Sequence, residues 1–166
     1  HLIQFCTFRL DGHLFGIDVR QVQEVLREVA ITPVPLAADA VSGLFSLRGR
    51  NVPAVDLRRC LDFPDRSDDC PPVSLIVETS IGLIGLLADS IGDVLEPDPS
   101  EFEAAAENAG SEAQQIIGVY KLPQTLLRVL DLSQTVAKVM SGRLENVHQE
   151  AASHAGTIAD SHPAGR

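Results

Sequence analysis

Residues 43–57 read GLFSLRGRNVPAVDL, and the same pattern returns at residues 118–132 as GVYKLPQTLLRVLDL. The two stretches align without a gap, so that Val55-Asp56-Leu57 falls on Leu130-Asp131-Leu132. Each predicts an apolar strand, a four-residue turn, a second strand and a short helix, because apolar runs bounded by turn residues favour strands and Asp favours a helix start. The chain therefore contains an internal repeat built on β-hairpins.

An earlier part of each half repeats in the same way. Gly16-Ile17 aligns with Gly85-Leu86, and the next alignments are Val22 with Ile91, Glu24 with Asp93 and Val25 with Val94. The turn residues Asp11-Gly12 predict a tight hairpin between residues 2–10 and 13–17. Asp18 is expected to cap a short helix that carries Val19, Val22 and Val25 on one side.

Short strands separated by Gly, Pro and Asp turns are typical of an all-β barrel or sandwich. Further strands are expected over residues 41–47, 52–55, 73–78, 83–88, 115–122 and 125–130. The sequence predicts two similar halves, residues 1–66 and 67–140, each forming one of two small β-barrels packed side by side. Residues 100–112 are expected to be a polar connection. A C-terminal helix begins at Asp131, and residues 141–166 are expected to hold its end and a disordered tail.

Composition narrows the class of protein. The 166 residues include 23 acidic and 13 basic side chains, and the resulting net charge of −10 argues against a nucleic-acid binder. The longest uncharged runs have ten residues, whereas a membrane-spanning helix needs about 20. The three cysteines, Cys6, Cys60 and Cys70, form neither a disulfide framework nor a zinc motif. We therefore expect a soluble cytoplasmic protein with reduced thiols and no membrane insertion.

The acidic residues are concentrated in the middle of the chain. Residues 67–120 contain eleven Asp and Glu residues and no Lys or Arg. This distribution is consistent with a solvated face that keeps the protein soluble. The alternative is electrostatic steering toward a basic partner.

Motifs for catalysis and for cofactor binding are absent from the sequence. It has no phosphate-binding loop, dinucleotide fingerprint, zinc-protease motif, nucleophile elbow or calcium loop, and its five histidines lack a metal-ligand spacing. Asp56 and Asp131 are the candidates for a general base. Because both occupy the same position of the repeat, at the start of a helix, capping is the preferred interpretation. We expect no catalytic residue, no cofactor and no metal.

The turn after residue 47 is where the two halves differ most. The first half has Arg48-Gly49-Arg50-Asn51, and the second has Pro123-Gln124-Thr125-Leu126. Positions that match serve the shared fold, whereas positions that differ are free to specialise. Arg48 can present a forked donor to a carboxylate, or it can pair weakly with a neighbouring acidic residue on the surface.

The assembled motifs resemble the CheW-like domain of bacterial chemotaxis. The resemblance extends from about Phe5 to Met140 and rests on FGIDV (15–19), VQEV (22–25), GLFSLRG (43–49), VPAVDLR (52–58), GLLAD (85–89) and DVL (93–95). These motifs occur in the family's order. Ser46 departs from it, because it stands where the family usually has Asn.

The resemblance implies a noncatalytic adaptor made of two SH3-like five-stranded β-barrels. Such domains couple the cytoplasmic tips of methyl-accepting chemoreceptors to the regulatory domain of the histidine kinase CheA, at receptor arrays on the inner face of the membrane. Carried over position by position, the receptor-binding residues are Val22, Glu24, Gly43, Arg48, Ile91 and Val94. The last two are the repeat partners of Val22 and Val25 and line a groove between the barrels.

The sequence leaves three alternative functions open. The adaptor could serve a pathway other than swimming, such as surface motility. The chain could be an enzyme that uses Asp56 or Asp131 as a general base. It could also be the regulatory part of a larger kinase or of an adaptor linked to a receiver domain. The sequence predicts neither the kinase-contact residues nor the role of residues 140–166.

Overall fold

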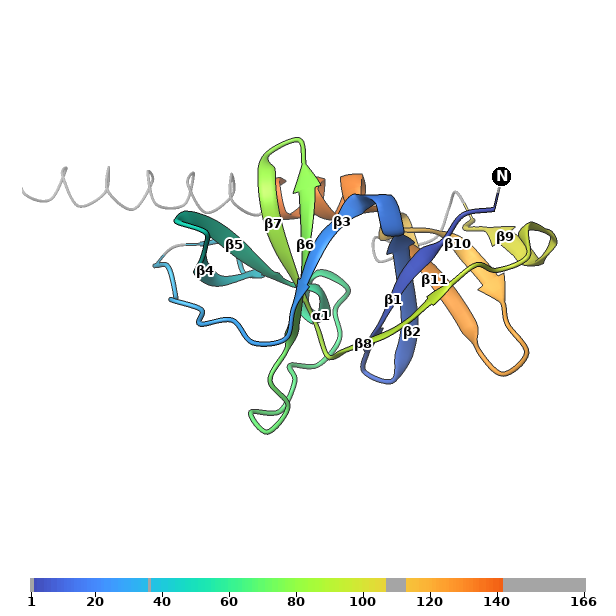
Figure 1. Ribbon diagram of the computed structural model, residues 1–166, viewed down its shortest axis with the longest axis horizontal. Helices are drawn as coiled ribbons and strands as arrows, with labels where there is room; N and C mark the ends of the chain where they lie inside the picture. The colour runs from blue at the N-terminus through green and yellow to red at the C-terminus, as the bar shows by residue number, and fades with distance from the viewer. Residues whose placement is uncertain (1, 36, 107–112, 142–166) are drawn as a thin grey trace, which may run out of the picture.

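The computed structural model describes residues 2–35, 37–106 and 113–141, and its principal elements are β-strands (Figure 1). In chain order the strands are β1 (Phe5–Leu10), β2 (His13–Asp18), β3 (Val22–Leu26), β4 (Val41–Leu47), β5 (Arg50–Asp56), β6 (Val73–Thr79), β7 (Gly82–Ala88), β8 (Ser90–Leu95), β9 (Phe102–Ala104), β10 (Ile116–Lys121) and β11 (Leu126–Leu130). The helical elements are α1 (Leu57–Cys60), the 3₁₀ turns η1 (Val19–Gln21), η2 (Pro99–Glu101) and η3 (Ala113–Gln115), and a helix over 132–141. The predicted all-β class is confirmed.

The strands form two sheets that lie side by side, sheet 2 on the left of Figure 1 and sheet 1 on the right. Sheet 1 has the order β8-β1-β2-β11-β10-β9, and sheet 2 has the order β3-β6-β7-β5-β4. The two SH3-like barrels predicted from the sequence are therefore present. Sheet 1 has six strands instead of five, because β9 forms within the segment expected to be a polar connection and pairs with β10.

The two sheets do not correspond to the two halves of the repeat. Sheet 1 takes β1 and β2 from the first half and β8 to β11 from the second, and sheet 2 takes the reverse combination. In each sheet, one parallel pair of strands joins the two halves of the repeat. In sheet 1, β2 pairs with β11 and Gly16 lies opposite Val129. In sheet 2, β7 pairs with β5 and Gly85 lies opposite Ala54, at the equivalent positions of the repeat. The prediction that each half forms its own barrel is wrong, because each half contributes its first hairpin to the other sheet.

One hydrophobic core joins the two sheets. Its fully buried members include Phe8 and Ile17 from sheet 1 and Leu75 and Leu86 from sheet 2. The helix over 132–141 adds Leu132 and Val136 to the same cluster, and α1 adds Leu57 and Cys60. Burial of apolar side chains from both sheets stabilises their relative placement at about 25 cal/mol per Å² removed from water.

Two local expectations differ from the structure. The helix expected after Asp18 is limited to the three residues of η1, and the chain then continues as β3, which pairs with β6. The four-residue turn expected after Leu47 is a two-residue turn, in which Arg48 has φ 50° and Gly49 has φ 78°. Positive φ at both central positions matches the twist of an antiparallel hairpin, which explains the tighter turn. The expected tail beyond residue 141 lies outside the described residues.

Candidate functional site

An ion pair on the surface joins two of the predicted site residues. Arg48, in the turn between β4 and β5, donates from Nη2 to Oε2 of Glu24 on β3 across 2.8 Å. Strands β3 and β4 are the opposite edges of sheet 2, so this contact forms where the sheet curls toward closure. The Arg48 side chain is 75% exposed and that of Glu24 is 30% exposed, which leaves most of the guanidinium accessible.

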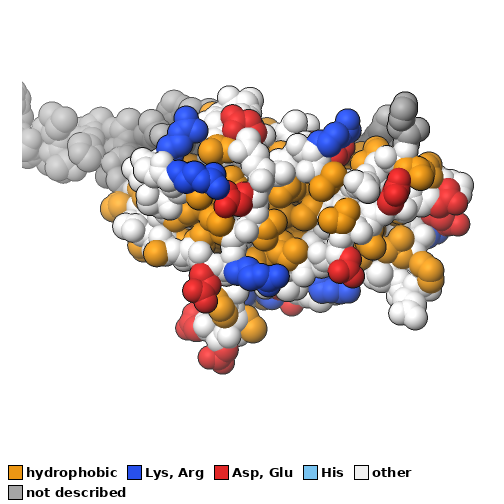
Figure 2. Space-filling model, in the orientation of Figure 1, with side chains coloured by type: hydrophobic (Ala, Val, Ile, Leu, Met, Phe, Trp, Pro, Cys, Tyr) orange, Lys and Arg blue, Asp and Glu red, His pale blue; other side chains and the backbone are white. Residues whose placement is uncertain are grey.

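Val22 and Ile91 occupy equivalent positions on β3 and β8. Both are half-buried and pack against the core that the sheets share. Hydrophobic side chains gather over the middle of the face drawn in Figure 2, between the two sheets. Val94 is farther along β8, opposite Cys6, and its side chain is 54% exposed. The structure thus places apolar side chains of β3 and β8 at the seam, the boundary between sheet 1 and sheet 2. The assignment of a binding groove there stays a prediction.

Gly43 lies inside the fold and not on its surface. Its φ of 150° is unfavourable for residues with a side chain, and a Cβ atom there would collide with the carbonyl oxygen of Thr32. The segment around Thr32 pairs with Leu44 through two backbone hydrogen bonds of 2.7 and 2.9 Å. Gly43 therefore permits the close approach of this segment to β4, and a direct role in binding stays a prediction.

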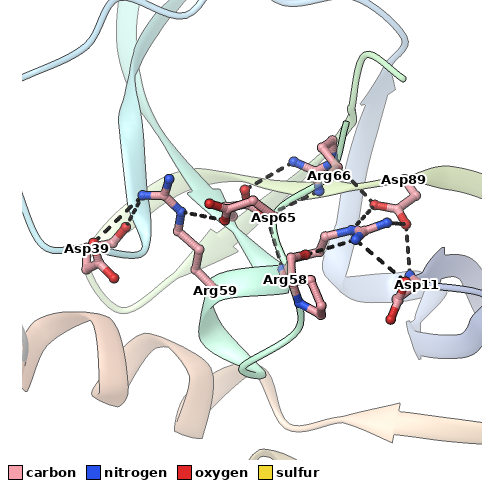
Figure 3. A network of polar contacts seen from close by, with 9 residues as sticks. Asp11, Asp39, Arg58, Arg59, Asp65, Arg66 and Asp89 are labelled. Atoms are coloured by element: carbon pink, nitrogen blue, oxygen red, sulfur yellow. Dashed lines mark hydrogen bonds and ion pairs between the residues drawn. The ribbon is translucent and has the colours of Figure 1, made fainter. Parts of the chain in front are cut away.

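A network of charged side chains between the barrels was not predicted from the sequence (Figure 3). Arg58 at the start of α1 donates to both carboxylate oxygens of Asp89, at 2.8 and 2.6 Å. Arg66, in the loop before β6, contacts Asp89 at 3.2 Å and Asp56 at 3.1 Å. The backbone N–H of Asp11 in the β1–β2 turn donates to Asp89 at 2.8 Å. The network therefore connects a turn of sheet 1 with α1, which follows β5 of sheet 2.

Asp89 is ionised at the centre of this network. Burial acts to raise its pKa, but hydrogen bonds from Arg58 and from the Asp11 backbone, with the charges of Arg58 and Arg66, hold the pKa below its ordinary value. The side chains of Asp89, Arg58 and Arg66 are only 11–18% exposed, so solvent screens them weakly. The partners are far apart in the chain, and no local sequence signal links them.

The two aspartates considered as general bases occupy helix caps. Asp56 accepts the backbone N–H of Arg58 at 3.1 Å and also receives the guanidinium of Arg66. Asp131 accepts the backbone N–H of Gln134 at 3.2 Å. The capping interpretation is confirmed for both positions of the repeat.

Across residues 2–35, 37–106 and 113–141, no group of three or more His, Cys, Asp or Glu side chains is arranged to hold a metal ion. Among the residues that the structure describes, no helix combines the length and the apolar character needed to cross a membrane.

Comparisons with known proteins agree with the resemblance noted in the sequence. The family model of the CheW-like domain matches residues 4–140. The chemotaxis protein CheW of Klebsiella aerogenes is 27% identical over 145 residues, which cover 87% of each chain. The chemotaxis protein CheW of Bacillus subtilis is 27% identical over 136 residues, 81% of this chain and 87% of the relative. The crystal structure of the scaffolding protein TtCheW from Thermoanaerobacter tengcongensis superposes with a TM-score of 0.73 at 24% identity, covering 80% of this chain and 90% of that one.

Proposed function

The chain belongs to the CheW-like domain family, and from that premise we propose that it is a noncatalytic chemotaxis adaptor. In this proposal it couples the cytoplasmic tips of chemoreceptors to the regulatory domain of the histidine kinase CheA. Its work takes place in the cytoplasm, at receptor arrays on the inner face of the membrane. The relatives named above are chemotaxis and scaffolding proteins, which supports an adaptor over an enzyme.

The observation that carries the proposal is the exposed pair of Glu24 and Arg48. One Nη2 hydrogen bond to Glu24 fixes the position of the guanidinium, while the remaining N–H groups of Arg48 stay available. A fork of donors held in place is suited to a carboxylate on a receptor. Glu24 then acts as the positioning residue, and Arg48 makes the contact.

The apolar residues near the seam supply the other half of the proposed interface. Half-buried Val22 and Ile91 offer a floor, and exposed Val94 offers a contact at its margin. A shallow apolar surface with one charged group suits an amphipathic helix, and a receptor tip is a helical hairpin of this kind. Gly43 contributes indirectly, because it lets the chain around Thr32 close over β4.

The proposal also includes the kinase partner and the pathway output, for which no residues are assigned. Docking of one barrel on a similar barrel of the kinase would use exposed apolar side chains at a barrel end. The enzyme alternative is less well supported, because Asp56 and Asp131 both accept helix-capping hydrogen bonds. Surface motility, or another chemosensory output, is the alternative pathway.

Reversal of one charge tests the receptor site. We expect Arg48→Glu to weaken binding of a chemoreceptor cytoplasmic fragment at least about tenfold in a titration. Arg is enriched among the interface residues whose truncation costs about 2 kcal/mol or more, and about 1.4 kcal/mol corresponds to a tenfold change. The exposed pair contributes no more than about 1 kcal/mol to stability, so the free energy of unfolding is expected to change little. The matched control is Arg50→Glu, which reverses an exposed charge two residues away on β5.

Two further measurements distinguish contact from stability. The double variant Glu24→Arg with Arg48→Glu restores an ion pair in the opposite sense, and we expect it to recover stability but not receptor binding. Binding of the kinase regulatory domain is expected to stay unchanged in Arg48→Glu. Receptor affinity that is the same for wild type and Arg48→Glu would falsify the assignment of this site.

A further inference from the structure

An apolar pocket lies on the sheet 2 barrel, apart from the proposed receptor site. It has a volume of about 380 Å³ and is enclosed by β4, β5 and β7, the helix over 132–141 and the segment near Val34. Of the described residues that line the pocket, Thr135 alone has a polar side chain, and its hydroxyl donates to the carbonyl of Asp131 at 2.9 Å. Val22, Glu24, Gly43, Arg48, Ile91 and Val94 do not line the pocket. Its size falls in the range of sites that bind small apolar groups.

The internal repeat shows what fills the equivalent place in sheet 1. There Phe15 stands at the position of Ile84, and α1 stands at the position of the helix over 132–141. Phe63 follows α1 and packs between this helix and the β1–β2 hairpin. Its ring centroid lies 6.0 Å from that of Phe15 and 5.5 Å from that of His13. In the sheet 1 barrel, the aromatic ring of Phe63 therefore fills the place that corresponds to the pocket.

Among the described residues, no aromatic side chain lines the pocket of the sheet 2 barrel, for two reasons. After α1 the chain reverses through Asp62, whose φ is 57°, and the reversal returns Phe63 to the sheet. The helix over 132–141 continues through the same position, where Lys138 replaces Phe63 and extends away to the carbonyl of Cys60 at 2.5 Å. In addition, Ile84 is smaller than Phe15.

The rim of the pocket indicates the source of its occupant. Val34, Ile81 and Met140 line the pocket, and their side chains are 39%, 46% and 37% exposed. An exposed apolar rim around a pocket is one feature of a protein-binding site. A small molecule held inside the pocket would leave this apolar rim in water, whereas a partner segment would bury it.

We propose that this pocket is a docking site for one aromatic side chain of a partner protein, seated where Phe63 is seated in the sheet 1 barrel. The partner presents this aromatic residue from an apolar segment that covers Val34, Ile81 and Met140. The contact resembles an interface anchor, in which a buried aromatic group supplies most of the affinity and the surrounding contacts exclude water. This inference does not depend on the receptor site formed by Glu24 and Arg48.

The test uses N-acetyl-phenylalanine amide as a surrogate for the anchor and N-acetyl-alanine amide as the matched probe. Methyl NMR of the whole chain is expected to show saturable shifts of Ile84, Val139 and Met140 with the phenylalanine probe only. Ile84→Phe places in sheet 2 the residue found in sheet 1, and we expect it to weaken this binding at least tenfold. Val139→Phe fills the pocket from the helix and serves as a second variant if Ile84→Phe does not fold.

Three outcomes would overturn the inference. The first is no saturable shift with the phenylalanine probe. The second is shifts that persist in every filled variant that folds, which would place the binding elsewhere. The third is binding of toluene without binding of N-acetyl-phenylalanine amide, which would indicate a cavity closed to a side chain carried on a backbone. Binding of receptor fragments is expected to be the same in Ile84→Phe and wild type, so this test stands apart from that of Arg48.

Discussion

Asp89 is the residue whose substitution most directly tests the connection between the two barrels. In Asp89→Asn the neutral amide keeps the size of the side chain, but Arg58 loses its closest charge partner and Arg66 loses one of two. Removing one member of a buried ion pair costs roughly 3–5 kcal/mol. Because Arg66 keeps Asp56 and Arg58 keeps a hydrogen bond to a backbone carbonyl, we expect a loss of about 2 kcal/mol in the free energy of unfolding.

Urea unfolding followed by far-UV circular dichroism measures this loss. For a chain of this size, about 2 kcal/mol corresponds to a fall in melting temperature of roughly 4–8 °C. The control is Glu103→Gln, which removes a surface pair with Lys121 whose side chains are 72% and 62% exposed. That change is expected to cost no more than about 0.5 kcal/mol. Equal effects of Asp89→Asn and Glu103→Gln would refute the structural role of the network.

The difference in the free energy of unfolding between wild type and Asp89→Asn is expected to change with pH in one direction. The pKa of Asp89 is lower in the folded protein than in the unfolded chain, where an Asp has a pKa of about 3.9. Its contribution is therefore complete above the unfolded pKa and is lost as pH falls through the folded pKa. We expect the stability difference between wild type and Asp89→Asn to be constant near neutral pH and to shrink below about pH 4. A difference that grows on acidification contradicts this assignment.

Two more predictions concern the helix caps and the thiols. Asp131→Ala is expected to cost about 1 kcal/mol in urea unfolding, because it removes a cap. Asp56→Ala is expected to cost about 3 kcal/mol, because it also removes one of the two carboxylates that face the buried guanidinium of Arg66. Equal losses in the two variants would contradict this difference in environment. In the native protein a thiol reagent is expected to modify exposed Cys70 only, since Cys6 and Cys60 are buried and burial raises the pKa of Cys60 to about 12. All three thiols should react in denaturant, and rapid modification of Cys60 in the native state would show that its site opens.

Much of the local structure follows from sequence pattern, but the neighbours of each strand do not. The alignment of residues 43–57 with residues 118–132 predicts two hairpins, and both are present as β4–β5 and β10–β11. The alternation of apolar and polar residues along a strand indicates which face is buried, but it does not indicate which strand lies beside it. The parallel pairing of Gly16 with Val129 joins segments from opposite ends of the domain, so the exchange of hairpins was missed.

The helix expected after Asp18 shows how a short pattern misleads. Val19, Val22 and Val25 recur every three residues, which is typical of a helix. The same residues are β-branched and favour a strand, and pairing of Val22 with Val77 on β6 decides between the two. Tertiary pairing outweighed a weak local preference.

Part of the candidate site also follows from the sequence, and part of it does not. Arg48 was singled out because its turn differs between the halves, and its side chain is exposed on the surface as that argument requires. Its contact with Glu24 depends on sheet curvature that brings two edge strands together, which no local pattern encodes. Asp89 was missed because its partners Arg58 and Arg66 lie in another part of the chain.

The exchange of hairpins makes the domain indivisible during synthesis. The β1–β2 hairpin is made before every other strand of the domain, but β11, which pairs with β2 in the finished sheet, is the last strand of the described residues. Neither barrel is complete until nearly all of the domain has emerged. A gene fragment that encoded either half alone would yield hairpins with open edges, which are prone to aggregation. Each half of the repeat therefore depends on the other half for the strands that complete its sheets.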